Sequence, residues 1–386
     1  MMEEIVLMRN KKQNVLFFIE SLAGGGAEKV LSTLVQHLDK SKFDVTVCVV
    51  SGGGRYEDEV KQCCNYKALL NIPSSPIERA IYKIKHHLIY KWLPMWLVYM
   101  LFVPKGNDVE VAFVEGFATK LMAASTNEKA RKVAWVHIDL HRFHWTKEVF
   151  HSHKEEEDAY NCYDAIVVVS KTAEDAIQQE FNLTVPVQTI YNPVDCASIL
   201  GLSEQKKYII PRSHACRLVS VGRFSKQKAY MRLLSIVKRL RDEGYDIELW
   251  LLGDGTEKEA MQEFVSNNNL KDVVTFFGFL SNPYQYLVQG DLFVCSSISE
   301  GFSTAITEAL ILGLPVVSTE VSGVREQLNN GCGIVTENNE DSLFDGVKYL
   351  VTHMDELDEM SRRATERGKE FRLDMAMKNI ESVLLA

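Results

Sequence analysis

Residues 14–38 read NVLFFIESLAGGGAEKVLSTLVQHL and contain the pattern on which the fold prediction rests. The first seven residues are almost all apolar, as in a strand that is covered on both faces. Three glycines follow, and apolar residues then recur at the i, i+3, i+4, i+7 spacing of a helix with one buried face. Strand, tight loop and amphipathic helix together predict a βαβ unit in a parallel sheet.

The same alternation continues along the chain in two series. Further strand patterns of the first series lie at 44–50, 109–114, 132–138, 165–170 and 187–192. Those of the second series lie at 217–223, 247–253, 273–278, 292–297 and 315–319. Between the series, residues 191–213 lose periodicity, and we expect a linker there. The predicted fold class is α/β, with two tandem Rossmann-like doubly wound domains that face each other across a ligand-binding cleft.

Composition narrows the class of protein. The chain has 386 residues, of which 46% are hydrophobic and 25% charged, as in ordinary globular proteins. Its net charge of -9 argues against broad nucleic-acid binding, which needs a basic footprint. The eight cysteines include no Cys-x-x-Cys pair, and the first twenty residues lack the features of a secretion signal. We therefore expect a cytoplasmic protein with reduced thiols.

Residues 77–103 combine basic and apolar side chains in a helical pattern that ends in a run with two tryptophans. The apolar run at 92–103 is much shorter than the roughly 20 residues that span a bilayer. Two interpretations are open. The segment is a helix pair packed on the first sheet, with its lysines in water and its tryptophans in the core, or it makes peripheral contact with an anionic membrane.

Gly24, Gly25 and Gly26 lie between the first strand and the first helix. Such a loop lets the backbone approach a ligand, and the helix that follows offers free N–H groups to an anion. Lys29 stands where Gly-x-Gly-x-x-Gly requires its third glycine, and the chain contains no P-loop motif. The alternative is a tight turn that needs only one glycine.

In VGRFSKQK, Arg223 leaves the first strand of the second series and Lys228 follows five residues later. An arginine fork and a lysine point charge can together neutralise a diphosphate. The alternative is a pair of solvated loop cations.

His137 directly follows a strand pattern in WVHIDLHRFHW, where an imidazole can position a substrate hydroxyl. A structural histidine is an equal alternative. The histidines of this stretch lack the neighbours of a zinc site, and we expect no metal.

In SEGFSTAITEALILGL, residues 299–314, a helix is expected to begin near Ser303 or Thr304 and to end before Gly313. Glu300 then lies at the mouth of the helix and Glu308 about one turn inside it.

These motifs occur in an order that resembles one enzyme family. The glycine-rich loop, the arginine with a lysine five residues on, LLGDGTE at 251–257, GFL at 278–280 and Glu-x7-Glu in EGFSTAITE resemble the retaining glycosyltransferases of the GT-B fold, family 4. SLAGGGAEKVLSTL, AWVHIDLH and YNPVD resemble, more narrowly, bacterial enzymes that assemble capsule, exopolysaccharide or lipopolysaccharide.

The resemblance implies an acceptor-binding domain at 1–195, a nucleotide-sugar-binding domain at 196–371, and a C-terminal helix at 372–386 that packs back on the first domain. It implies transfer of a hexose or N-acetylhexosamine from a nucleotide diphosphate sugar, taken to be a UDP-sugar, to a hydroxyl of a lipid-linked or glycan acceptor. The reaction would retain configuration and use no metal or other cofactor, and the chain contains no Asp-x-Asp.

The resemblance also assigns roles to individual residues. Glu300, His137, Arg223 and Lys228 would form the catalytic set, with the two cations on the diphosphate. Glu300 would contact hydroxyls of the donor sugar, Glu308 the ribose, and His137 the region of the sugar's C6 hydroxyl. The full donor-binding set is Gly24, Gly25, Gly26, Arg223, Lys228, Phe279, Leu280, Glu300, Gly301, Phe302, Ser303, Thr304 and Glu308.

Two departures from the family pattern affect loops. Ala229 replaces the glycine that usually follows the lysine, and TEVSGVRE has one glycine where a pair is usual. The alternatives to a transferase are a nucleotide-sugar epimerase or a phosphorylase-like enzyme on the same fold, or a non-catalytic partner of another transferase.

Overall fold

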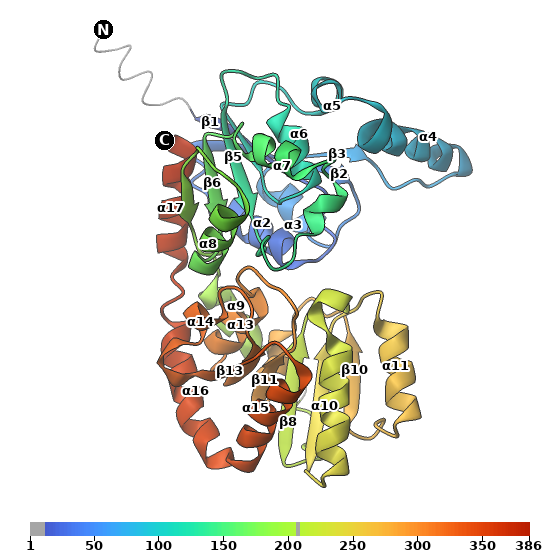
Figure 1. The fold of residues 1–386 in the computed structure, drawn as a ribbon, viewed down its shortest axis with the longest axis vertical. Coiled ribbons are helices and arrows are strands. Elements are labelled where there is room, and N and C mark those ends of the chain that lie inside the picture. The colour runs from blue at the N-terminus through green and yellow to red at the C-terminus, as the bar shows by residue number, and fades with distance from the viewer. Residues whose placement is uncertain (1–11, 206–208) are drawn as a thin grey trace. The chain divides into compact units, whose positions relative to one another are not determined.

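The computed structural model describes residues 12–205 and 209–386. Residues 1–11 of the expected first domain and 206–208 of the expected linker lie outside the described residues. The chain forms two compact units (Figure 1), of which one contains the described residues up to Pro193 together with Asp374–Ala386. The other unit is Val194–Leu373.

The C-terminal helix α17 (Leu373–Leu385) packs on the unit built from the N-terminal half of the chain. Lys42 Nζ lies 2.7 Å from Glu381 Oε2, and Arg131 Nε donates to the carbonyl of Val383 at 3.0 Å. The side chains Met377, Ile380, Val383 and Leu384 are buried, so an apolar stripe holds the helix in place.

The first unit is built on a parallel sheet of seven described strands in the order β3-β2-β1-β4-β5-β6-β7. The strands are β1 (Gln13–Ile19), β2 (Phe43–Ser51), β3 (Asn65–Leu70), β4 (Val109–Ala112), β5 (Arg131–Val136), β6 (Ala165–Val168) and β7 (Val187–Thr189). Strand order reverses direction between β1 and β4, which pair in parallel from Val15↔Val109 onward. Open α/β sheets bind ligands at the carboxyl ends of the strands at such a reversal.

Helices follow most strands of the first unit, as a parallel sheet requires. They are α2 (Gly26–His37), α3 (Glu57–Cys63), α4 (Pro76–His87), α5 (Met95–Phe102), α6 (Phe117–Ala123), α7 (His153–Tyr160) and α8 (Lys171–Glu180). A π-helical turn, η1 (Leu88–Trp92), joins α4 to α5, and η2 (Trp145–Glu148) is a 3-10 turn.

The second unit has a parallel sheet of six described strands in the order β10-β9-β8-β11-β12-β13. The strands are β8 (Cys216–Val221), β9 (Ile247–Leu252), β10 (Val274–Gly278), β11 (Leu292–Cys295), β12 (Val316–Thr319) and β13 (Gly333–Thr336). The helices are α9 (Cys196–Glu204), α10 (Tyr230–Asp242), α11 (Lys258–Asn267), α12 (Tyr284–Leu287), α13 (Thr304–Ile311), α14 (Val324–Gln327), α15 (Glu340–Thr352) and α16 (Met354–Gly368). The 3-10 turns are η3 (Lys226–Lys228) and η4 (Asn329–Gly331). The reversal of strand order falls between β8 and β11.

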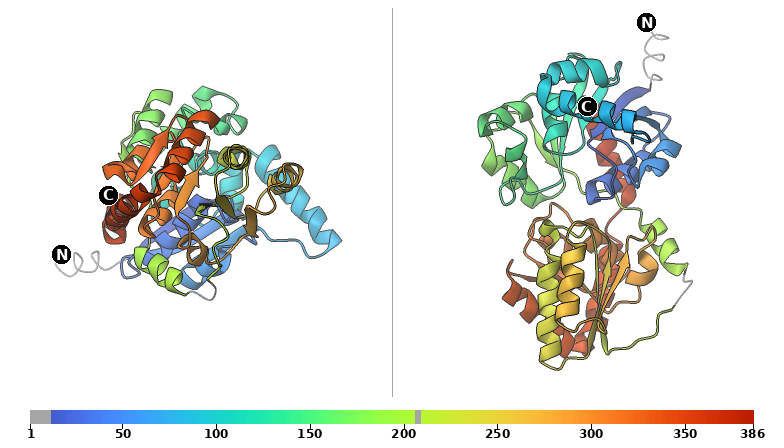
Figure 2. Two further views of the ribbon diagram at one scale, coloured as in Figure 1. Left: turned by 90° about the horizontal axis from the view of Figure 1, so that it is seen from below. Right: turned by 90° about the vertical axis from the view of Figure 1, so that its right-hand side faces the viewer.

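Helices lie on both faces of this second sheet (Figure 2). A hydrophobic cluster packs against each face. Leu218 and Leu249 belong to one cluster, while the next residues, Val219 and Trp250, belong to the other. This alternation arises because successive side chains of a strand point to opposite faces. Strands covered on both sides must be apolar throughout, which explains the continuous apolar runs in the sequence.

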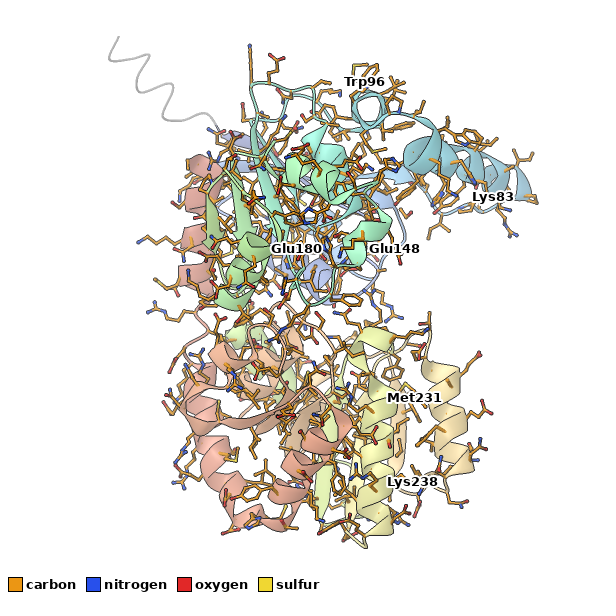
Figure 3. The ribbon with its side chains drawn as sticks, viewed as in Figure 1. Lys83, Trp96, Glu148, Glu180, Met231 and Lys238 are labelled. Carbon is orange, nitrogen blue, oxygen red and sulfur yellow. The ribbon has the colours of Figure 1, made fainter. Side chains whose placement is uncertain are left out.

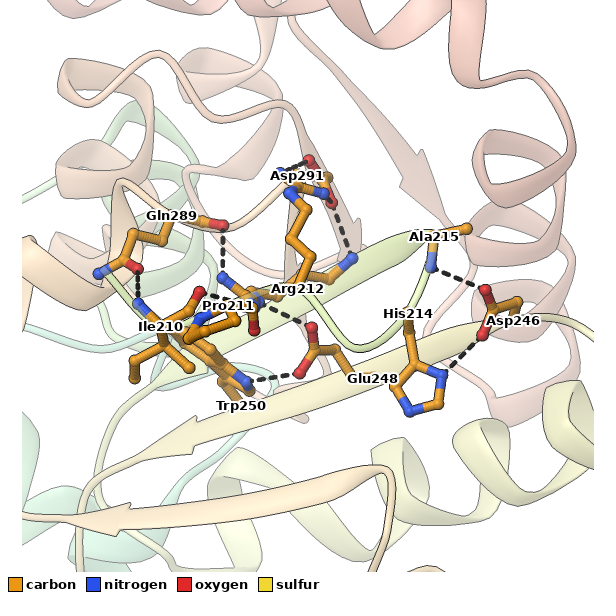
Figure 4. A network of polar contacts seen from close by, with 11 residues as sticks. Ile210, Pro211, Arg212, His214, Ala215, Asp246, Glu248, Trp250, Gln289 and Asp291 are labelled. Carbon is orange, nitrogen blue, oxygen red and sulfur yellow. Dashed lines mark hydrogen bonds and ion pairs between the residues drawn. The ribbon is translucent and has the colours of Figure 1, made fainter. Parts of the chain in front are cut away.

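Polar contacts tie the segment before β8, including Ile210 and Arg212, to the second unit (Figure 4). A buried arginine of β8 adds to these contacts. Arg217 is 1% exposed, and its Nε donates to Glu248 Oε1 at 2.9 Å while its guanidinium lies 3.8 Å from the centre of the Trp250 ring. The same guanidinium donates to the carbonyls of Gln289 and Pro211. Its charge is therefore both paired and fully hydrogen-bonded, as a buried cation requires.

The predicted two-domain α/β fold is confirmed, but two strands were not predicted. Both β3 and β13 lie at sheet edges, where one side of a strand has no partner. Side chains of β3 alternate between exposed and covered positions, so Asn65–Leu70 lacks a continuous apolar run. The pattern used to predict strands favours those buried on both faces, and it missed these two edge strands although it found the other two, β7 and β10.

The expected linker at 191–213 contains the helix α9, which the sequence analysis did not predict. Asp195 caps this helix by accepting a hydrogen bond from the Ser198 N–H at 2.9 Å. Its apolar residues do not form one stripe, since Ile199 is buried while Leu200 is 46% exposed. The absence of a single apolar face explains why no helical period is visible there.

The segment 77–103 forms α4, η1 and α5, and the expectation that its tryptophans lie in the core is wrong. Trp92 is 64% exposed and Trp96 is 50% exposed. The α4 helix contains no buried residue and extends from the body of its unit (Figure 1). Within the described ranges, 12–205 and 209–386, no helix is both long and apolar enough to cross a membrane.

Candidate active site

A small pocket lies at the carboxyl ends of β8 and β11, where the strand order of the second unit reverses. It is lined by residues of both strands, of the loops that follow them, and of the first turn of α13: Ser220, Val221, Lys228, Tyr230, Phe293, Cys295, Ser296, Ser297, Glu300, Ser303 and Ala305. Three residues of the predicted set, Lys228, Glu300 and Ser303, therefore line the same pocket.

Lys228 and Glu300 form an ion pair in this pocket. Lys228 Nζ donates to Glu300 Oε1 at 2.5 Å, and the hydroxyl of Ser297 donates to the same oxygen at 2.6 Å. Burial by itself would lower the pKa of Lys228, but the charge of Glu300, the charge at Cys295 and the hydrogen bond to Glu300 together raise it. Lys228 is thus a cation at neutral pH, held at the edge of the pocket.

The loops that carry this ion pair are joined by hydrogen bonds. Gln227 Nε2 donates to the carbonyl of Ser299 at 2.8 Å, and the hydroxyl of Ser296 donates to the carbonyl of Lys228 at 2.8 Å. Ala229 follows with φ 48° and ψ 43°, in the left-handed region. That conformation favours glycine, which explains why the usual residue of the family pattern here is glycine.

The start of α13 is held by the neighbouring α14. Gln327 Nε2 donates to the carbonyl of Ser303 at 2.7 Å and to Thr307 Oγ1 at 2.8 Å. The Ser303 side chain makes no capping hydrogen bond, although Ser303 is the N-cap residue. Backbone N–H groups at this end of the helix therefore have no side-chain cap, and a helix N-terminus attracts anions.

None of the remaining predicted residues of the second unit lines the pocket. Arg223 lies close enough to Lys228 for its charge to oppose protonation of that lysine. Glu308 is 5% exposed in α13 and does not line the pocket. Phe279 and Leu280 follow β10, and Phe279 is 42% exposed. Gly301 approaches Gly323, where an added Cβ would lie 2.7 Å from the Gly301 carbonyl oxygen.

In the first unit, the glycine loop connects β1 to α2 at the point where the strand order reverses. Gly24 has φ +119°, which disfavours other residues, and a Cβ there would lie 3.1 Å from Arg55 Cδ. Gly25 is the N-cap residue of α2 and provides no side-chain cap. This helix N-terminus is therefore also without a side-chain cap.

His137 follows β5 and is neutral, because burial lowers its pKa to about 3. Its Nδ1 bonds to the backbone carbonyl of Phe113, and its Nε2 is buried with no hydrogen-bond partner among the described residues. With Nδ1 as the donor, Nε2 carries a lone pair and is an acceptor for a hydroxyl.

Two buried carboxyl groups near His137 were not predicted. Glu115 Oε2 accepts the backbone N–H of His137 at 3.0 Å, and Glu115 Oε1 accepts Trp145 Nε1 at 3.3 Å. Burial raises the pKa of Glu115 and also that of Glu20, which ends β1 and accepts Tyr90 Oη at 3.2 Å. Each glutamate directly follows a strand pattern next to the strand-order reversal, and that position is the signal that could have identified them.

Two such units, each with a parallel sheet and a site at the reversal of strand order, define the GT-B class of fold. Solved structures share it. The Anabaena protein HepE, in a complex with UDP, has a TM-score of 0.71 at 18% identity, covering 96% of this chain and 99% of that one. Sucrose-phosphate synthase from Thermosynechococcus elongatus has a TM-score of 0.77 at 15% identity, covering 96% of this chain and 98% of that one.

Sequence comparison then identifies the family. The model of "Glycosyltransferase Family 4" matches residues 24–198, and that of "Glycosyl transferases group 1" matches residues 206–370. The chain belongs to the glycosyltransferases that these two models describe. It is therefore a transferase.

Similar proteins include two bacterial glycosyltransferases. One is the N-acetylgalactosamine-N,N'-diacetylbacillosaminyl-diphospho-undecaprenol 4-alpha-N-acetylgalactosaminyltransferase of Campylobacter jejuni, which is 28% identical over 93% of this chain and 96% of its own length. Another is the O-antigen biosynthesis glycosyltransferase WclY of Escherichia coli, 26% identical over 48% of this chain and 52% of its own.

Proposed function

We propose that the protein transfers a hexose or N-acetylhexosamine from a nucleotide diphosphate sugar to a hydroxyl of a lipid-linked or glycan acceptor, with retention of configuration. The observation that carries the proposal is the Lys228–Glu300 pair in a pocket beside the uncapped start of α13. A cation and a helix N-terminus recognise a diphosphate, and a carboxylate recognises sugar hydroxyls.

A UDP-sugar is the proposed donor. The HepE structures, which share this fold, hold UDP or UDP-glucose, and Lys228, Glu300 and Ser303 of the proposed donor-binding set line the pocket of the second unit. Arg223 and Lys228 would hold the diphosphate, Glu308 the ribose hydroxyls, and the backbone at Phe279 and Leu280 the base.

A lipid-linked acceptor in cell-surface polysaccharide synthesis is the proposed second substrate. The Campylobacter jejuni relative, which aligns along nearly its whole length, is named for a diphospho-undecaprenol substrate. Synthesis of capsule, exopolysaccharide or lipopolysaccharide would use an acceptor of this class. The place of action would then be the cytoplasmic, inner face of the plasma membrane.

In the proposed reaction the acceptor hydroxyl attacks on the face from which the diphosphate leaves, and a phosphate oxygen takes its proton. Negative charge grows on the leaving diphosphate, and Lys228, Arg223 and the α13 N–H groups would stabilise it without a metal. Glu300 would hold sugar hydroxyls, and the neutral Nε2 of His137 would accept a further hydroxyl.

The test is a transfer assay with a panel of nucleotide sugars, in the presence and absence of EDTA, against prenyl-diphosphate-linked and free glycan acceptors. We expect release of nucleoside diphosphate with one donor, insensitivity to EDTA, and an α linkage from an α donor by NMR. An inverted linkage, or a strict need for a divalent cation, would contradict the proposed mechanism. Epimerised donor without transfer would instead favour an epimerase.

A further inference from the structure

Large apolar side chains are exposed along one side of α4. Ile77, Ile81 and Ile84 are 75%, 47% and 55% exposed, and their i, i+4, i+7 spacing places them on one face of the helix. Contiguous exposed apolar side chains of this size mark a site of interaction with another molecule or with a membrane.

The opposite side of α4 is the side that holds the helix to the unit. Tyr82 Oη lies 3.2 Å from Ser51 Oγ, and the His86 ring lies 4.6 Å from that of Tyr90. Tyr90 in turn packs on Phe117 at 4.3 Å between ring centres. The isoleucine face is therefore directed away from the unit, and none of its residues is buried.

The exposed apolar surface continues through η1 into α5. Trp92 and Trp96 are 64% and 50% exposed, while Val98 and Tyr99 of the same segment are buried and anchor it. The side chains of Lys83 and Trp96 extend outward from the body of the unit (Figure 3). Tryptophan in such a position is typical of the boundary between lipid headgroups and acyl chains.

The charges on this surface are mostly positive. Arg79, Lys83, Lys85 and Lys91 are all exposed, and Glu78 is the one acidic residue between 72 and 103. The whole chain has a net charge of -9, so this surface is positively charged on a protein that is negatively charged overall. An apolar face flanked by lysines complements an anionic bilayer, which supplies both acyl chains and negative headgroups.

We propose that residues 77–103 form a docking surface for an anionic phospholipid bilayer, with the isoleucine face and the two tryptophans at headgroup depth. The inference rests on the proposed function only in that a lipid-linked acceptor gives a reason for docking. Tyr90 of η1 donates to Glu20 at the carboxyl end of β1, next to the glycine loop. A bilayer on this surface therefore lies next to elements that lead into the ligand crevice of the first unit.

The first test is sedimentation of the full chain with vesicles of phosphatidylcholine alone and with about one third phosphatidylglycerol. We expect pelleting with anionic vesicles only, and weaker pelleting when salt rises from about 0.05 M to 0.5 M. Lys83→Glu/Lys85→Glu is expected to reduce partitioning more than about tenfold. Lys129→Glu/Lys378→Glu reverses the charge of two exposed lysines outside the surface and is the matched control. Its partitioning onto anionic vesicles should fall far less.

The second test uses tryptophan fluorescence. Trp135 and Trp250 are 1% exposed and Trp145 is partly buried, so a blue shift on adding anionic vesicles is expected to come mainly from the exposed Trp92 and Trp96. Trp92→Ala/Trp96→Ala should remove the shift and weaken pelleting several-fold, whereas Met375→Ala, at a residue 49% exposed on α17, should change neither.

Equal recovery in the supernatant with neutral and anionic vesicles would overturn the proposal. So would binding that the lysine and tryptophan variants leave unchanged, or self-association through the same surface in sedimentation velocity. Transfer to a water-soluble acceptor should be equal in the wild type and the surface variants. If the wild type does not bind anionic vesicles but transfers to the water-soluble acceptor, docking alone is refuted. If the wild type binds vesicles but shows no activity with any donor, the proposed function alone is refuted.

Discussion

The ammonium nitrogen of Lys228 lies 2.5 Å from Oε1 of Glu300, and both side chains line the pocket between β8 and β11. The pair neutralises two groups that would otherwise be costly to bury, since Glu300 is 8% exposed. A dianionic ligand in this pocket would compete with Glu300 for the same cation. Under the proposed function, Lys228 would stabilise the negative charge that grows as the diphosphate leaves.

Lys228→Ala is expected to lower kcat/KM for transfer by about 10²–10³ while the chain still folds, because it removes a cation from the leaving group. Lys226→Ala, at an exposed lysine of the same η3 turn, is the matched control and should retain nearly full activity. The measurement is steady-state kinetics, with thermal unfolding to confirm the fold. Equal activity of the two variants would show that Lys228 does not contact the diphosphate.

Glu308→Ala is expected to raise KM for the donor by about tenfold or more, because a carboxylate that accepts two ribose hydroxyls contributes to binding before the reaction starts. Glu263→Ala, on the exposed side of α11, serves as the control. Calorimetric titration with UDP separates binding from turnover. If UDP binds both variants as tightly as the wild type, the ribose assignment is wrong.

His137 is expected to make folding stability depend on pH below 6.5. Its pKa in the folded state is about 3, against an ordinary 6.5, so the unfolded chain binds a proton that the folded chain does not. The stability that the neutral His137 contributes is fully present above pH 6.5. It falls as pH decreases toward 3, by on the order of 2–3 kcal/mol at pH 4.5. Urea unfolding of His137→Gln should show a smaller loss between these pH values. If the free energy of unfolding depends on pH in the same way in the wild type and the variant, the imidazole is not buried in its neutral form.

Ala229→Gly is expected to stabilise the second unit by about 0.5–1 kcal/mol, because Ala229 has φ 48°. Ala260→Gly, at an exposed position in the first turn of α11, should instead destabilise it by up to about 1 kcal/mol. The denaturant midpoints of both variants test whether stability rises at one position and falls at the other. A loss of stability at both positions would show that Ala229 is not left-handed in the folded chain.

Arg217→Ala is expected to cost about 3–5 kcal/mol, because it leaves Glu248 buried without its cation. Replacing both partners with apolar residues, Arg217→Met/Glu248→Leu, should recover much of that loss. Arg362→Ala breaks a pair whose side chains are 77% and 47% exposed and should cost less than about 1 kcal/mol. Equal costs at the two arginines would contradict the buried network.

Much of the candidate site could be predicted because its members stand next to strand patterns. Lys228 and Glu300 follow β8 and β11, and the pairing of these two strands places their loops in contact. The roles of Ser297 and Gln327 could not be predicted in this way. They act through hydrogen bonds to loops whose shape no local pattern encodes, and a serine or glutamine in a loop carries no signal of its own.

The sequence by itself determined the two parallel sheets, since strands covered on both faces must be apolar throughout and helices between them must carry one apolar stripe. It also determined which residues leave those strands at their carboxyl ends. Only the tertiary structure decided that Trp92 and Trp96 are exposed and that Lys228 pairs with Glu300. Burial and ion pairing depend on neighbouring residues that are distant in the chain. The pattern of residue types along one segment does not contain information about those neighbours.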